Sequence, residues 1–180
     1  MTTAVRPFSG TYLSDPVHSS FGFSVRYSGL SSYRGTLDDV QASLTADEGG
    51  IVLAGTAQAE SISIQNPPQF RSHVLGPEFF DAQNHPTVSF RSTAVELSDG
   101  GTARVEGELT IAGRTNPVVA TGTWAEPRPG AAGFELEASF DRRDFGIDWQ
   151  MELPGGGIAL DYEVTLEVEL PLKQPEDGDG

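Results

Sequence analysis

Three histidines are the residues of this chain best suited to acid–base chemistry or metal binding. They are His18, His73 and His85, and Asp81 lies between the last two. Neutral imidazole is a common metal ligand. However, the sequence has no pair of histidines four residues apart and no HExxH motif. We therefore expect these histidines to form local hydrogen bonds and expect no metal ion.

A second group of ionisable residues lies in the segment FDRRDFGIDW at 140–149. Its aspartates are Asp141, Asp144 and Asp148, and they flank Arg142 and Arg143. Paired carboxylates can transfer protons in catalysis, but such a mixture is more typical of a surface whose charges compensate one another. The chain has no GxSxG motif for a nucleophilic serine and no GxxxxGK[ST] phosphate loop. We therefore assign no catalytic residue.

The stretch FRSHVLGPEFFDAQNHPTVSF at 70–90 is unusually aromatic for a connection between strands. Asn66 is a good helix N-cap and Pro67 suits the first helical position, while Gly76 favours a helix end. Phe70 and Val74 then share one helical face. The pattern predicts a short helical insert with an aromatic face that must be buried against the inside of a sheet.

Most of the remaining sequence alternates with a period of two. In IALDYEVTLEVEL at 158–170 the apolar residues share one parity and the polar ones the other, which predicts a long strand with one buried face. Weaker alternation and turn motifs predict further strands at 21–27, 37–44, 51–59, 88–97, 105–111, 117–125 and 133–145. About eight strands joined by short turns indicate an antiparallel meander, closed as a barrel or folded as a sandwich, with the helical insert between the third and fourth strands.

Composition excludes several classes of function. The 180 residues suit a single domain, here 1–172, followed by an acidic tail at 173–180 that we expect to be disordered. Eleven Lys and Arg against a net charge of −15 leave no basic patch for nucleic acid. The absence of cysteine excludes disulfides and thiolate chemistry. The sequence has no signal peptide and no apolar run long enough for stable membrane insertion, which predicts a cytoplasmic protein, or a periplasmic or secreted one if a leader was trimmed.

A continuous apolar face, an aromatic insert and a few nearby Arg and His side chains are typical of a small-molecule pocket with a polar mouth. An eight-stranded barrel has room either for packed side chains or for one ligand. The pattern does not distinguish a filled barrel from a hollow one.

Four motifs in order resemble the YceI family of lipocalin-like polyisoprenoid-binding proteins, from about Gly10 to Leu172. They are YLSDPVHSSFGFSVRY, the aromatic insert FRSHVLGPEFFDAQNHPTVSF, GELTIAGRTNPV and FDRRDFGIDW. The chain departs from the family pattern at Ser72, where an acidic residue is frequent, and at His85, where an aromatic residue is frequent.

The resemblance implies an all-β, extended eight-stranded antiparallel lipocalin-like barrel with an apolar tunnel. It implies non-enzymatic binding, storage or transport of a long-chain isoprenoid, an isoprenoid quinone or a similar amphiphilic lipid, with no other cofactor. The residues expected to line the tunnel are Phe21, Phe23, Phe79, Phe80, Phe90, Phe145, Trp149, Leu160 and Tyr162. Those expected at the polar end of the ligand are His18, Arg71, His73, His85 and Arg142.

Other interpretations remain open from the sequence. Arg71 suits a phosphate-bearing head group, but it also suits an ion pair with Asp81 or Glu78. An isomerase or cyclase acting on a lipid-like substrate would use His18, Arg71 and Asp144. A barrel packed solid would instead be a structural or stress-response module. An exposed strand edge would allow a homodimer.

Overall fold

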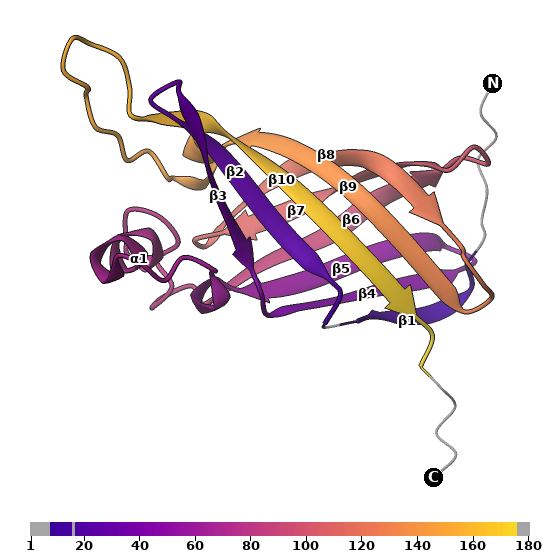
Figure 1. Cartoon of the computed structure of the whole chain (residues 1–180). Coiled ribbons are helices and arrows are strands. Elements are labelled where there is room, and N and C mark those ends of the chain that lie inside the picture. The colour runs from indigo at the N-terminus through magenta and orange to yellow at the C-terminus, as the bar shows by residue number, and fades with distance from the viewer. Residues whose placement is uncertain (1–7, 16, 176–180) are drawn as a thin grey trace.

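One antiparallel sheet accounts for nearly all of the computed structural model, which describes residues 8–15 and 17–175 (Figure 1). Within these residues the strands are β1 (Gly10–Ser14), β2 (Ser20–Tyr27), β3 (Ser31–Leu37), β4 (Val40–Asp47), β5 (Gly50–Gln58), β6 (Thr87–Leu97), β7 (Thr102–Ile111), β8 (Arg114–Ala125), β9 (Ala131–Asp141) and β10 (Leu160–Lys173). The helices are α1 (Pro68–Leu75) and two 3-10 turns, η1 (Ala59–Ser61) and η2 (Arg142–Phe145).

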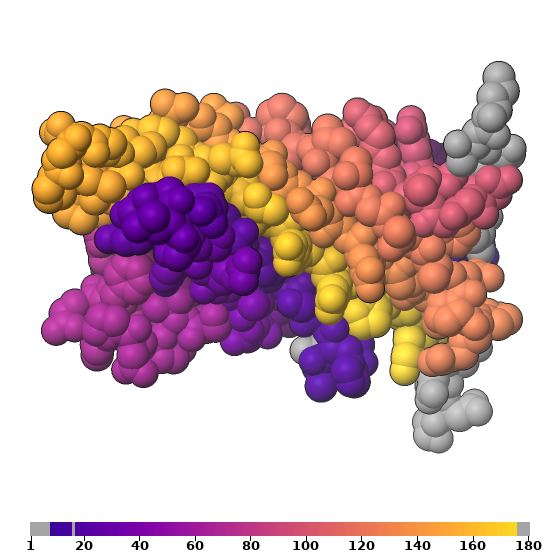
Figure 2. All heavy atoms as spheres, turned by 45° about the horizontal axis from the view of Figure 1, so that its top comes forward, coloured from indigo at the N-terminus to yellow at the C-terminus, as the bar shows by residue number. Residues whose placement is uncertain are grey.

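The sheet closes into a barrel because β1 pairs with both β4 and β10. The closed ring therefore contains eight strands, β1 and β4 to β10, and the predicted fold class is confirmed. Strand β10 pairs with β9 along one edge, whereas its other edge pairs first with β2 and then with β1. Figure 2 shows β10 as a band between β9 and the β2–β3 hairpin, which prolongs the wall at one end.

Strand β10 follows the alternation read from the sequence. Val164, Leu166 and Leu170 are buried, whereas Glu163 and Glu167 on the opposite parity are exposed. The pattern breaks at the start of the strand, where the pairing with β2 shifts register between Leu160 and Val164. A register shift of this kind redirects the side chains that precede it, because strand residues alternate between faces.

Short turns join most neighbouring strands. Between β7 and β8, Ile111 pairs with Arg114, so that only two residues form the turn. Both have positive φ, 52° at Ala112 and 78° at Gly113. This backbone matches the right-handed twist of a two-residue hairpin and favours glycine.

The predicted helical insert is α1, with two differences from expectation. The helix begins at Pro68 with Pro67 as N-cap, one residue later than predicted, while Gly76 caps its end as predicted. In chain order α1 follows the fifth strand rather than the third. The sequence analysis did not predict β1 and β3 as strands of their own, because both are short and are interrupted by polar residues and glycine.

The apolar interior divides into two clusters at opposite ends of the barrel. At the end away from α1, Phe8 packs against Tyr12, Trp124 and Phe134, with ring centroids 5.4, 5.7 and 6.1 Å away. These rings and their neighbours fill that end. The other cluster lies toward α1 and surrounds the larger of the two cavities described below, whereas the smaller cavity lies between the clusters.

Strand β10 extends one residue past the predicted domain end at 172. Lys173 still pairs in β10, and the Gln174 side chain donates a hydrogen bond to the Ser9 carbonyl at 2.8 Å. Of the predicted tail 173–180, residues 176–180 lie outside the described residues. No helix in the described part of the chain is long and apolar enough to cross a bilayer.

Candidate functional site

A cavity of about 370 Å³ occupies the α1 end of the barrel, and we call it the mouth cavity. Its walls come from β2, β3, α1, the segment that follows η2 and the first half of β10. The side chains that line it are almost all apolar or aromatic: Phe21, Phe23, Val25, Tyr27, Tyr33, Leu37, Phe70, His73, Val74, Phe79, Phe80, Val88, Ile111, Phe140, Arg142, Ile147, Trp149, Met151, Leu160, Val164 and Leu166. Its volume is within the range of small-molecule sites.

A second cavity of about 110 Å³ lies deeper in the barrel, and we call it the inner cavity. Phe21, Val88 and Leu166 line both cavities and therefore mark the boundary between them. Phe90 lines only the inner one. Beyond it, the packed rings around Phe8 form the floor. The barrel is thus hollow toward α1 and filled at the other end.

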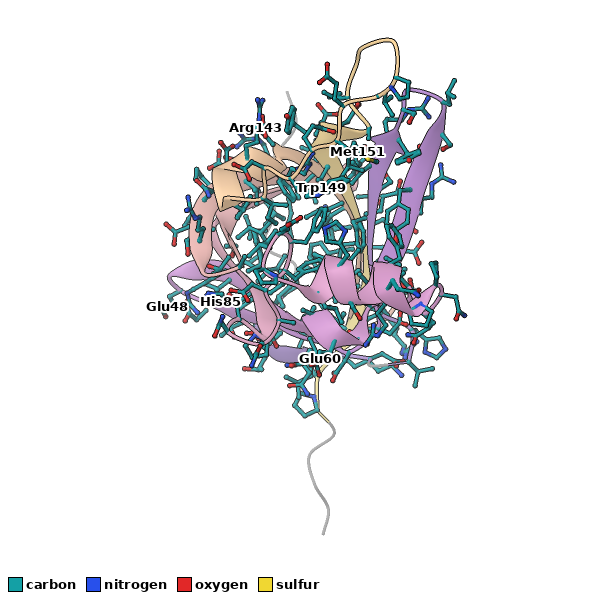
Figure 3. The ribbon with its side chains drawn as sticks, turned by 90° about the vertical axis from the view of Figure 1, so that its left-hand side faces the viewer. Glu48, Glu60, His85, Arg143, Trp149 and Met151 are labelled. Atoms are coloured by element: carbon teal, nitrogen blue, oxygen red, sulfur yellow. The ribbon has the colours of Figure 1, made fainter. Side chains whose placement is uncertain are left out.

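The rim of the mouth cavity is apolar and faces solvent. Tyr27 at the end of β2, Phe70 on α1 and Met151 after η2 line the cavity and are also large exposed hydrophobic residues. Figure 3 looks into this end of the barrel, where Trp149 and Met151 lie on the segment that borders the opening. The cavity is therefore accessible from one face of the molecule.

Aromatic contacts hold α1 against the rest of the rim. His73 donates a hydrogen bond from Nε2 to the Glu78 carboxylate at 2.8 Å. Its ring lies edge-on to those of Phe79 and Trp149, at centroid distances of 5.0 and 5.1 Å. These contacts join α1, the turn that follows it and the segment after η2, so the insert forms one wall of the cavity as its aromatic pattern predicted.

Arg142 is a buried cation beside the cavity. Its guanidinium donates to the carbonyl oxygens of Asp161, Ile147 and Leu160 at 2.9, 2.9 and 3.0 Å. Burial lowers the pKa of Arg142. Because all three nitrogens bond to backbone carbonyls, this arginine fixes the start of β10 relative to the segment after η2.

Tyr33 on β3 contributes a polar atom that the sequence analysis missed. Its hydroxyl is buried and has no hydrogen-bond partner, while its ring packs edge-on against Phe70 at 5.1 Å. Burial raises the pKa of Tyr33 to about 12, so the phenol stays protonated at neutral pH. Strand β3 alternates weakly, and nothing in SSYRGTL indicated which side chains face inward.

Nine of the predicted site residues line a cavity. The apolar ones are Phe21, Phe23, Phe79, Phe80, Trp149 and Leu160 at the mouth and Phe90 in the inner cavity; the polar ones are His73 and Arg142. Whether they contact a ligand stays a prediction.

Two apolar candidates are placed elsewhere by the structure. Phe145 is buried in η2 against Phe140, with ring centroids 5.0 Å apart, and does not line the cavity. Tyr162 lies in the register shift of β10, and the guanidiniums of Arg142 and Arg143 lie 4.7 and 4.0 Å from its ring centroid. Simple alternation had placed it on the inner face.

Three polar candidates also lie outside the cavity lining. His18 sits on the exposed turn before β2 and bonds Asp15 through Nδ1 at 2.7 Å. His85 packs its ring over Gly113, where only a glycine leaves room. Arg71 donates to the Glu60 carbonyl at 2.8 Å and more weakly to two other carbonyls, so neither of the expected ion pairs forms.

The structure does not assemble the candidate catalytic group. Asp144 is exposed in η2, while His18 and Arg71 lie on separate elements with the partners just described. Asp141 and Arg143 form an exposed ion pair at 2.6 Å, in keeping with a compensating surface. In the described ranges, 8–15 and 17–175, no three metal-ligating side chains gather at one point.

Comparisons with known proteins identify a family, relatives and solved structures that this chain resembles. The family model described as the YceI-like domain matches residues 12–172. A UPF0312 protein of Pseudomonas aeruginosa is 31% identical over 160 residues, which cover 84% of this chain and 81% of that protein. The crystal structure of Burkholderia cenocepacia BcnA superposes with a TM-score of 0.73 at 20% identity, covering 88% of this chain and 98% of that one. A polyisoprenoid binding domain from Saccharophagus degradans, implicated in plant cell wall breakdown, gives 0.70 at 10% identity, covering 91% and 98%.

Proposed function

The chain belongs to the YceI-like domain family, and on that premise we propose that it binds a long-chain isoprenoid, an isoprenoid quinone or a similar amphiphilic lipid in the mouth cavity, for storage or transport and without a catalytic step. The observation that carries the proposal is the apolar cavity, which is open at one end and lined by aromatic and aliphatic side chains.

The physical argument is one of solvation. Each methylene transferred from water into an apolar site contributes about 0.8 kcal/mol. A prenyl chain therefore gains affinity from the cavity walls alone, without any reactive group. The similar domain from Saccharophagus degradans, a polyisoprenoid binding domain, supports the same ligand class.

The structure favours neither alternative function. The candidate catalytic residues His18, Arg71 and Asp144 do not line the cavity. A barrel packed solid would leave no room at the α1 end, where the mouth cavity lies.

The test is solvent extraction of the natively purified protein, followed by mass spectrometry of the extract. A near-stoichiometric prenyl species or related lipid supports the proposal and identifies the ligand. Protein that carries no lipid and takes up no added isoprenoid refutes it.

A pair of variants ties the lipid to the cavity. Phe23→Asp puts a carboxylate into the mouth cavity, whereas Ser24→Asp puts one on the opposite face of β2, since neighbouring strand residues alternate. We expect lipid to be lost only in Phe23→Asp, because a buried charge without a partner costs several kcal/mol. Equal lipid content in both folded variants would contradict binding in this cavity.

A further inference from the structure

Tyr33 carries the one buried side-chain nitrogen or oxygen without a hydrogen-bond partner among residues 8–15 and 17–175. Such atoms are rare in folded proteins, because nearly all buried polar groups are paired. This hydroxyl belongs to a side chain that lines the mouth cavity. An acceptor that reaches this side chain from the cavity would complete its pairing.

The donor is neutral. Burial raises the pKa of the Tyr33 phenol to about 12, so the group keeps its proton at any physiological pH. A phenol presents one O–H to an acceptor oxygen. A ketone, quinone, ether or hydroxyl oxygen satisfies it without bringing a charge into the cavity.

We propose that the Tyr33 hydroxyl donates a hydrogen bond to a neutral oxygen at the polar end of the bound lipid, and that this site selects carbonyl- or hydroxyl-bearing lipids over phosphorylated ones. This inference rests on the proposed lipid binding and adds the identity of the head group.

The cations near the cavity do not favour a phosphate. Every nitrogen of Arg142 already donates to a backbone carbonyl. Arg71 lies outside the cavity lining and bonds to carbonyls around η1. His73 is paired with Glu78. A phosphate inside the cavity would lose its hydration without gaining a free cation among the side chains that line it, which is strongly unfavourable.

The experiment uses four probes that share one farnesyl tail: farnesylacetone, farnesol, the hydrocarbon farnesene and farnesyl phosphate. Each is titrated into delipidated wild-type protein and into Tyr33→Phe by competition with a fluorescent fatty-chain probe. Tyr162→Phe is the matched control, because Tyr162 lies outside the lining of both cavities.

We expect wild type to bind the ketone and the alcohol most tightly and the phosphate at least about tenfold more weakly. Tyr33→Phe should weaken ketone and alcohol binding about three- to tenfold, the value of one neutral hydrogen bond, and leave farnesene unchanged. Tyr162→Phe should leave the affinity for all four probes unchanged.

Other results overturn the inference in distinguishable ways. Equal affinities of Tyr33→Phe and wild type for the ketone, or a preference for the phosphate, refute the role of Tyr33 while lipid binding stands. Failure of all four probes to bind wild type refutes the proposed function itself.

Discussion

Phe21 should set the length of the lipid tail that the barrel accepts. Its side chain lines both cavities and sits on β2 opposite Leu37 of β3 and Val168 of β10. Replacing Phe21 with alanine should therefore join the mouth cavity to the inner cavity, which adds about 110 Å³ and the space of the ring itself.

The expected gain in affinity follows from the number of tail carbon atoms that enter the inner cavity. One further isoprene unit brings roughly five carbons, and drug-sized ligands gain about 0.3 kcal/mol per heavy atom. The gain is about 1.5 kcal/mol, or about tenfold in affinity for the longer tail. Because Phe21 is only half-buried, Phe21→Ala should cost about 2 kcal/mol of stability, less than the loss of a fully buried phenylalanine.

The assay is native mass spectrometry of delipidated protein with an equimolar mixture of geranyl, farnesyl and geranylgeranyl ketones. Phe21→Ala should shift the bound population by about one isoprene unit. Phe80→Ala is the control, because Phe80 lines only the mouth cavity. If folded Phe21→Ala shows the same length preference as wild type, Phe21 does not separate the cavities and the reasoning fails.

Three further substitutions, two of them with a matched control, test the residues that hold the barrel and the site. Arg142→Leu should lower the free energy of unfolding in urea by about 3 kcal/mol, since three carbonyls lose the hydrogen bonds that its guanidinium donates. Arg143→Leu at the exposed ion pair should change it far less. Equal changes in the two variants would contradict this role of Arg142. Gly122→Ala should prevent folding, as judged by circular dichroism, because the new methyl would overlap a carbonyl of β9, whereas Gly133→Ala has open space. Tyr33→Phe should remove one phenolate transition near pH 12 from an ultraviolet titration. Because the folded-state pKa of Tyr33 is raised, its phenol contributes stability below about pH 10 that is lost as pH rises through 12. Tyr33→Phe should therefore lose less stability than wild type over that interval. An unchanged titration would contradict the burial of Tyr33.

The strands that alternate over many residues could be predicted from the sequence, because period two has one structural cause. Strand β10 is the clearest example, with Val164, Leu166 and Leu170 all buried as expected. The aromatic insert was also predictable, since Phe79 and Phe80 need an apolar surface to cover. Both features depend on local pattern alone.

The errors have long-range causes. Tyr162 was misplaced because a register shift depends on pairing with β2. The carbonyl partners of Arg142 come from residues 147–161, and no sequence motif predicts that convergence. The unpaired hydroxyl of Tyr33 is a property of its surroundings in three dimensions, so no reading of SSYRGTL could have found it.

The barrel has one opening and a closed end, and is not a channel open at both ends. The closed end is filled by the packed rings of Phe8, Tyr12, Trp124 and Phe134. A lipid held in the barrel would enter tail first and leave by backing out along the same path. A membrane or protein that supplies it and one that receives it would then compete for a single face. Transfer would proceed by alternating encounters, with no ternary complex of donor, carrier and acceptor through this opening.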